Sequence, residues 1–444
     1  MSALYNRRRR SSRIAALSVC GFLLLVIYLG NFFDLLFITF LDKDLPGKVL
    51  KNLYLVAPLL LPVSWLYWGR VSLNIVDTRW IAYLGFLAIL ALGFSAGDGS
   101  STFGNLRLLL VFPVFYLIGK SLYLLFGYQT LRILVTFHIG AVFLIFLVGL
   151  IEVAAGQQFW AQFDVFDYYA SKVDRDFWQS NFGVPRSWVS WDLVPYIGTG
   201  VRRMVSLVLE PAGIGRLFAV ATIMVLYFRE LVPFNLYTRM ALFMIFVVGG
   251  LMTVSKGFIF LVAFYAVAHH INIKQAILVF VSVIGAMIFL VMSGQSAILG
   301  PSFLNHLSNI YFVLEALYSH PTGFGISVDH VASVSEAVNA PDDGRLAVRS
   351  EGGTMVVALL FGWLGLLLYA LWFLVLMLHR IVCPSLLRRD VLLSFIVLLS
   401  STFALSAFSA VGSALVFMLL GAVAEREAPR TGPVLLLPKA GYSV

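Results

Sequence analysis

The chain is poor in charged residues. Only 12% of its 444 residues are Asp, Glu, Lys or Arg, whereas soluble domains carry roughly 25%. Hydrophobic residues make up 60% of the sequence, and the mean hydropathy is +0.93. This composition excludes an ordinary soluble domain. It predicts an all-α polytopic membrane protein, because helices satisfy their own backbone hydrogen bonds in lipid.

Other features are also scarce. Cys20 lies in an apolar run and Cys383 in a basic loop, so neither a disulfide framework nor a cysteine metal site follows. We find no nucleotide-binding glycine loop, heptad pattern or repeat, and we expect neither metal nor cofactor. The net charge of +9 occupies short segments between apolar runs. That pattern is typical of membrane topology and argues against a nucleic-acid partner.

Long apolar segments are abundant. About 20 such residues cross the hydrocarbon core of a bilayer. The predicted spans are residues 14–33, 50–68, 80–96, 105–126, 131–154, 207–228, 240–254, 257–271, 276–293, 354–378, 391–406 and 408–424. They form one transmembrane domain over residues 1–424, followed by a tail of residues 425–444 that contains three prolines. The first span follows a basic segment without a small-residue cleavage site, so we expect it to be retained.

Basic residues set the predicted orientation. With twelve spans both termini lie on one side, which also receives most of the basic clusters, so that side is predicted to be the cytoplasm. The uncertain stretch is Met240–Ala268, which only Ser255-Lys256 interrupts. A single span there would place Arg388 and Arg389 outside, so we expect two short helices. Two large extracytoplasmic loops then remain, at residues 155–206 and 294–353.

Several charges fall at the outer membrane boundary. Arg216 is predicted on the order of 10 Å inside the hydrocarbon slab at 1.5 Å per residue, where an arginine costs at least about 2.5 kcal/mol. Pro211, Gly213 and Gly215 are expected to loosen or kink this helix. An ion pair between Arg216 and Glu210 is one explanation. A second is an anion site, because further cations are predicted at the same depth: Arg107, Arg202, Arg203 and Lys256.

The anion hypothesis has a chemical basis. Guanidinium groups bind phosphate through two parallel hydrogen bonds. A diphosphate joined to a membrane lipid would lie at this depth. The candidate ligand is therefore a lipid-linked diphosphate.

The first long loop is rich in aromatic residues interleaved with aspartates. Flat aromatic faces beside carboxylates suit sugar rings, which makes Trp178, Trp188 and Trp191 candidates for sugar binding. The alternative is an aromatic belt at the membrane surface. In the second loop, residues 304–318 form an amphipathic run expected to lie on the membrane or cover a cavity. A turn at residues 320–325 would let the backbone approach a ligand closely.

The second loop ends on charged residues at a predicted helix start. Arg345 and Arg349 precede Glu351, which heads the apolar segment 354–378. An acid at this position can simply stabilise the helix N-terminus. It can also act as a base beside the two arginines. His330 lies in the same loop, where an imidazole could serve as a base.

Four strings together resemble the O-antigen polymerase and O-antigen ligase superfamily. Arg203 to Pro211 resembles its R-x-x-S-x-x-x-E-P segment, and Thr253 to Gly257 its T-x-S-[RK]-G junction. His320 to Gly325 is similar to its (H/N)-P-x-G-x-G turn. Ser350-Glu351-Gly352, followed by Phe361 to Gly365, is similar to the start of its tenth helix. The likeness covers roughly residues 107–378, with long loops in corresponding places.

The resemblance implies a GT-C-like, metal-independent glycosyltransferase in the bacterial inner membrane, with both termini cytoplasmic. Its substrate would be a polyprenyl-diphosphate-linked oligosaccharide used at the periplasmic face, and a chain-length regulator would be a partner. Ligases of this superfamily carry a His-Asn pair where this chain has Ser350-Glu351, which favours a polymerase. A ligase and a transporter or flippase of lipid-linked sugars remain alternatives.

Roles follow from that hypothesis. Glu351 is the first candidate base, Glu210 the second and His330 the third. Diphosphate binding is assigned to Arg203, Arg216 and Lys256, with Arg345 and Arg349 closing from the loop and with Arg107 and Arg202 nearby.

Overall fold

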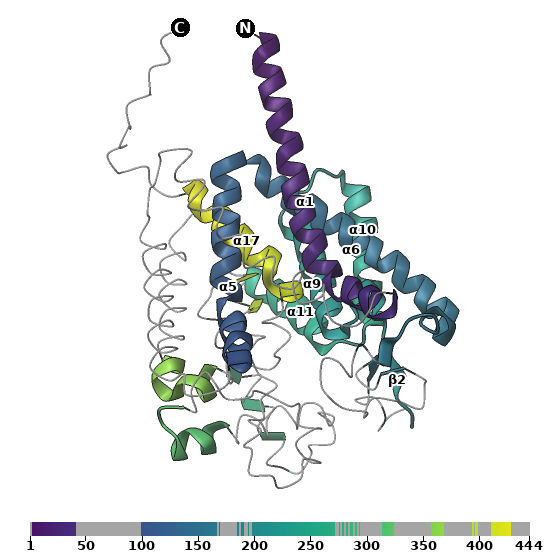
Figure 1. Cartoon of the computed structure of the whole chain (residues 1–444), viewed down its shortest axis with the longest axis vertical. Helices are drawn as coiled ribbons and strands as arrows, with labels where there is room; N and C mark the ends of the chain where they lie inside the picture. The colour runs from purple at the N-terminus through teal and green to yellow at the C-terminus, as the bar shows by residue number, and fades with distance from the viewer. Residues whose placement is uncertain are drawn as a thin grey trace.

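The computed structural model describes most of the central part of the chain. The described residues are 2–40, 99–166, 168, 184–185, 188–190, 194, 198–270, 313–323, 357–367 and 410–427, with isolated positions at 275–293 and 393–397. Most of them are helical, as the composition predicts, and they form a helical bundle (Figure 1). The predicted spans at 50–68 and 80–96 lie outside the described residues.

Two long helices run through the bundle towards the same end. α1 (Ser2–Phe40) and α6 (Gln129–Ala155) are joined by a hydrogen bond between the Tyr28 hydroxyl and Nδ1 of the buried His138, 2.7 Å long. Near the end of α1, Asn31 donates its amide to the Val208 carbonyl. Figure 1 shows this end opposite the N-terminus.

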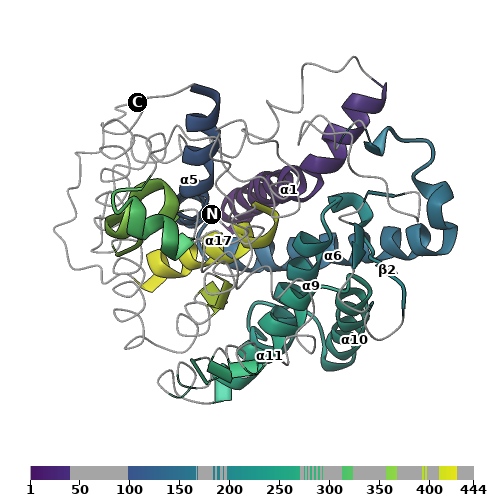
Figure 2. The same ribbon diagram turned by 90° about the horizontal axis from the view of Figure 1, so that it is seen from below.

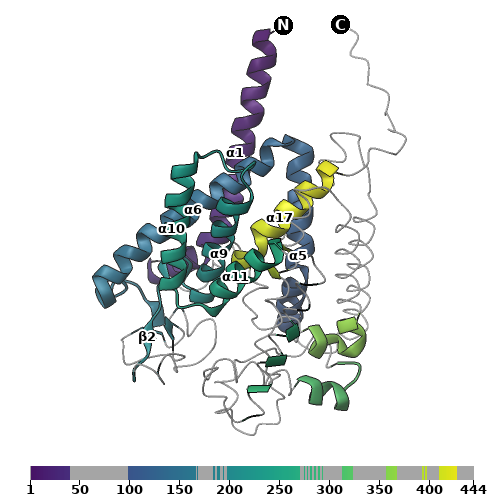
Figure 3. The same ribbon diagram turned by 180° about the vertical axis from the view of Figure 1, so that it is seen from behind.

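Three shorter helices follow one another along the chain, each antiparallel to the one before it. They are α9 (Pro211–Tyr227), α10 (Leu236–Met252) and α11 (Lys256–His270). Nε of Arg239 in the first turn of α10 donates to the carbonyl of Val225 near the end of α9. Residues 253–255 separate α10 from α11, so the prediction of two short helices in this stretch is confirmed. Figure 3 shows α9 and α10 side by side above the end that carries β2.

A further pair of helices, α5 (Gly99–Phe126) and α17 (Ala410–Glu427), packs in parallel. The rings of Phe112 and Phe417 lie 4.4 Å apart, and further along the pair Lys120 forms an ion pair with Glu425. Gly119 lies directly against the backbone of Met418. The end-on view of Figure 2 shows α5 on the opposite side of α1 from α10.

Replacing Gly119 with Ala should destabilise this pair. The added Cβ would meet the Met418 carbonyl, which is backbone and cannot rotate away, and overpacking of this kind costs about 1–3 kcal/mol. Gly140→Ala is the matched control, because a Cβ there meets nothing within 4 Å and alanine favours a helix by up to about 1 kcal/mol. Thermal unfolding in detergent should show a lower midpoint for Gly119→Ala alone. Equal midpoints for both variants would contradict the close packing.

Helix direction and surface composition agree with a membrane bundle. Leu17–Leu36 within α1 and Gln129–Ala155 are long and apolar enough to cross a bilayer. Exposed apolar side chains continue along α6 and α10, at Leu144, Leu147, Leu150, Ile151, Tyr237, Met240, Met244, Val248 and Leu251. Helices that are apolar on their outer face as well are typical of lipid surroundings. α5, α9, α11 and α17 run opposite to α1, α6 and α10, the alternation that the predicted spans require.

A small non-helical layer closes the end of the bundle where α9 begins. Strands β1 (Val189–Ser190) and β2 (Val201–Arg202) pair antiparallel. Beneath them lies an apolar cluster with Trp160 and Trp188 at its centre, their rings 5.2 Å apart. This layer fixes the approach of the chain to α9.

Candidate functional site

Two of the four strings noted in the sequence meet at this end of the bundle. The Met204 amide donates to the carbonyl of Met252, the last residue of α10. A Cβ on Gly215 would lie 2.5 Å from Cβ of Ser255. A Cβ on Gly257 would lie 3.9 Å from Nε of Arg216. The start of α9 and the junction between α10 and α11 therefore form one site, which we call the junction site (residues 203–216 and 252–257).

The start of α9 differs from the prediction. The helix begins at Pro211 instead of residue 207, and a short 3-10 turn at Ser206–Val208 precedes it. The expectation of a kink at Pro211 is wrong, because proline at the first helical position loses no intrahelical hydrogen bond. Gly215 serves instead to admit the Ser255 side chain.

Backbone strain gathers at the junction site. Within the described part of the chain, positive φ angles at residues other than glycine occur at Ser206 (42°), Leu209 (60°) and Val254 (46°). A β-branched valine in this region is a genuine outlier. Strained residues of this kind persist where their surroundings hold them, and they cluster at functional sites.

The junction site carries an excess of positive charge. Arg216 is 2% exposed and interacts electrostatically with Glu210, as the ion-pair explanation requires. Arg203 is half-buried beside the end of α10, and Lys256 is the exposed first residue of α11. A cation at a helix N-terminus is disfavoured by the helix dipole. A bound anion would offset this cost at Lys256.

Gly215→Ala should separate the two halves of the junction site. The new Cβ would meet Cβ and Oγ of Ser255, pushing α9 away from α11 and moving Arg216. Overpacking of this kind costs about 1–3 kcal/mol, so we expect a lower thermal unfolding midpoint in detergent. Ser255→Gly removes the two nearest obstructing atoms and leaves only Oγ1 of Thr253, at 3.1 Å, so Gly215→Ala should lower the midpoint much less in the Ser255→Gly background. An equal loss in both backgrounds would contradict this contact.

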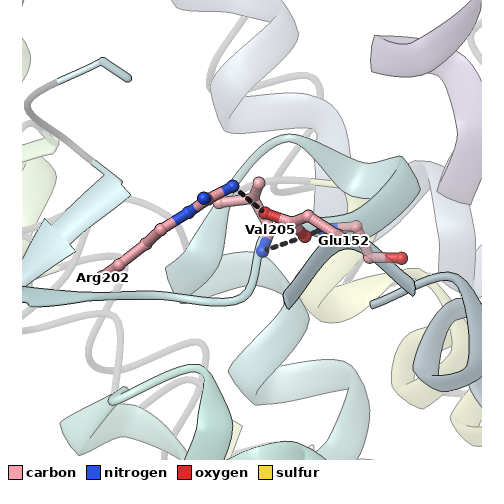
Figure 4. Close-up of polar contacts among 4 residues, drawn as sticks. Glu152, Arg202 and Val205 are labelled. Atoms are coloured by element: carbon pink, nitrogen blue, oxygen red, sulfur yellow. Dashed lines mark hydrogen bonds and ion pairs between the residues drawn. The ribbon is translucent and has the colours of Figure 1, made fainter. Parts of the chain in front are cut away.

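Arg202 pairs with a carboxylate of α6. It forms an ion pair with Glu152, with Nη2 and Oε1 3.3 Å apart, and Glu152 is completely buried (Figure 4). The structure thus gives Arg202 a buried carboxylate partner in α6. Glu152 was not among the predicted site residues. Its signal is that it is the one acid of α6 and lies in the last turn of that helix, where a negative charge is disfavoured by the helix dipole.

Trp188, a candidate sugar-binding residue, is fully buried. Its side chain packs with Trp160 in the apolar cluster below β1, and its carbonyl accepts a hydrogen bond from the Arg203 amide. A ring without exposed surface offers a sugar no face on which to stack. The structure gives Trp188 a packing role that also holds the backbone at Arg203.

The other two strings meet each other at a second place. The Trp363 amide, in helix Val357–Leu367, donates to the carbonyl of Pro321. Gly323 and Gly362 both have positive φ, and each lies against the other's backbone. The close approach expected for a ligand at this turn is occupied by the helix backbone. In the short helix 313–319, Val313 and Leu317 are buried while Leu314 and Tyr318 are exposed.

Six of the predicted site residues lie outside the described residues: Glu351, His330, Arg345, Arg349, Trp178 and Trp191. Arg107 was expected to open its helix, but α5 begins at Gly99, so Arg107 lies about two turns inside it. Among the side chains that the structure describes, no group of three His, Cys, Asp or Glu is arranged to hold a metal ion.

Comparison with known proteins gives no assignment: no protein-family model matches the chain, and no curated protein matches it significantly.

Proposed function

We propose that this protein is a membrane-embedded polysaccharide polymerase. It transfers a growing glycan from a polyprenyl-diphosphate carrier onto a lipid-linked oligosaccharide repeat at the periplasmic face of the bacterial inner membrane. The observation that carries the proposal is the junction site, where the buried Arg216 meets the first turn of α11.

The charge of the junction site supports a diphosphate as its ligand. Arg203, Arg216 and Lys256 all belong to the junction site, where α9 and α11 begin. Each helix N-terminus adds roughly half a positive charge. Phosphate oxygens accept hydrogen bonds from guanidinium and from helix N-termini alike.

The reaction needs a stabilised leaving group. The bond between the anomeric carbon and the diphosphate oxygen breaks, and the electron pair leaves with the diphosphate. In this proposal Arg216 and Lys256 stabilise that negative charge, because preorganised donors contribute most to a rate where charge develops. The acceptor hydroxyl forms the new bond to the anomeric carbon, and its proton passes to a base.

Glu210 and Glu351 are the competing candidates for that base. Glu210 occupies the N-cap position of α9 with an extended backbone, and its carboxylate lies beside Gly213 and near Arg216. Glu351 stays a prediction from sequence. We expect Glu351→Gln to abolish chain growth and Glu210→Gln to slow it by weakening the hold on Arg216. Full polymer length and rate from Glu351→Gln would eliminate Glu351. Glu210 and His330 would then remain, and complete loss of chain growth in Glu210→Gln would identify Glu210 as the base.

The decisive experiment uses purified protein in proteoliposomes. A lipid-linked oligosaccharide repeat is added with and without EDTA, and the glycans are separated on a gel. A polymerase gives a ladder that is insensitive to EDTA. Transfer of a single preformed chain to a lipid acceptor would indicate a ligase. Movement of the repeat across the bilayer without any new glycosidic bond would indicate a flippase and overturn the proposal.

A further inference from the structure

Glu152 is a buried carboxylate at a place that disfavours it. It lies in the last turn of α6, three residues before Ala155, and is 0% exposed. Negative charge at a helix C-terminus is unfavourable, and a buried charge is costly unless it is paired and hydrogen-bonded. An apolar residue at this position would cost less free energy to bury, so we expect the carboxylate to act through the groups that it binds.

Both oxygens of Glu152 are occupied by one short segment. Oε1 lies 3.3 Å from Nη2 of Arg202, and Oε2 accepts the backbone amides of Val205 at 3.1 Å and Ser206 at 2.7 Å (Figure 4). The Ser206 hydroxyl adds a second link to α6, donating to the Ile145 carbonyl at 2.6 Å. α6 therefore binds the chain on both sides of Arg203, at Arg202 and at Val205–Ser206.

These contacts with α6 fix the backbone conformation of the residues that lead into α9. Ser206 has a φ of 42° and Leu209 a φ of 60°, conformations that must be held by their surroundings. The Ser206 amide donates its hydrogen bond to Glu152. Four residues later Glu210 caps α9, and Arg216 follows within its second turn. The Glu152 carboxylate thus determines where Arg203 and the first turns of α9 lie.

We infer that Glu152 is the positioning residue of the junction site: it acts through Arg202, Val205 and Ser206 to hold Arg203 and Arg216 against the diphosphate. This inference rests on the proposed function. Because Glu152 is fully buried, it acts on the reaction through these neighbours. Its effect is on the rate and on the local backbone, because misplacement of binding groups by about 1 Å slows a reaction strongly.

Glu152→Gln is the test, since it keeps the shape and removes the charge. Its amide oxygen can still face Val205 and Ser206, but its NH₂ group then opposes the Arg202 guanidinium. We expect a 10- to 100-fold lower polymerisation rate at saturating lipid-linked repeat, with an unchanged apparent KM and an unfolding midpoint close to wild type. Hydrogen exchange at the Val205 and Ser206 amides should rise, while exchange in α5 and α17 stays as in wild type. Glu230→Gln, an exposed site beyond the far end of α9, is the control.

A double variant tests the pairing itself. Arg202→Met removes the guanidinium that opposes the glutamine NH₂, so Glu152→Gln/Arg202→Met should regain protection of the two amides. Unchanged exchange at both amides in Glu152→Gln would overturn the inference, and so would a lower rate accompanied by exchange increases throughout the bundle. If wild-type protein makes no polymer, the proposed function fails. The exchange data then still decide whether Glu152 positions the segment.

Discussion

Arg216→Ala is expected to lower the rate of chain growth by about 10²–10³-fold, the usual loss when a donor that stabilises developing charge is removed. Arg216 is 2% exposed and lies beside Gly257 at the start of α11. A cation from solvent therefore cannot take the place of its side chain in the Ala variant. Arg216→Lys should be nearly as damaging, because an ammonium group cannot form the paired hydrogen bonds of guanidinium with phosphate. Rates are measured in proteoliposomes with a lipid-linked repeat.

The control for this prediction is Arg229→Ala. Arg229 is exposed beyond the opposite end of α9, so its loss should leave the rate unchanged. Binding of polyprenyl diphosphate should weaken in both Arg216 variants and stay normal in Arg229→Ala. Wild-type rate and binding in Arg216→Lys would contradict the paired geometry. A wild-type rate and wild-type binding in Arg216→Ala would show that the diphosphate does not bind at this site.

Lys120→Met should cause the largest loss of stability. Lys120 and Glu425 join α5 to α17 with Nζ and Oε2 3.1 Å apart, and their side chains are 3% and 9% exposed. Removing one partner leaves a buried carboxylate without its counter-ion, which typically costs about 3–5 kcal/mol. The unfolding midpoint in detergent should fall markedly.

The double variant distinguishes pairing from packing. Lys120→Met/Glu425→Leu removes both charges and replaces them with apolar side chains of similar size, a change that is often neutral. We therefore expect it to be more stable than Lys120→Met alone. If the double variant is as unstable as the single one, the ion pair is not what Lys120 contributes to this interface.

Local sequence signals predicted part of the architecture. The break between α10 and α11 was predictable, because Ser255-Lys256 interrupts an apolar stretch too long for one span. The start of α9 was not, since residues 207–209 are as apolar as the helix that follows. Their conformation depends on the amides that Glu152 binds, and Glu152 lies 54 residues before Ser206.

The candidate site shows the same division. Arg216, Glu210 and Lys256 were found as charges in apolar surroundings, and the structure places Glu210 near Arg216 and the start of α11 beside Arg216. Arg202 could not be separated from Arg203 by sequence, because its partner Glu152 is 50 residues away. The burial of Trp188 was equally hidden. An aromatic residue in a polar loop can face sugar, lipid or the protein interior, and only the fold decides among them.

The proposed polymerase breaks one sugar–diphosphate bond at the junction site for each glycosidic bond that it forms. This ratio is measured in proteoliposomes by counting free polyprenyl diphosphate, by mass spectrometry, against the glycosidic bonds formed. We expect one released carrier for each new bond, with both products lost together in Arg216→Ala. Consumption of the lipid-linked repeat without any free polyprenyl diphosphate would contradict the proposal.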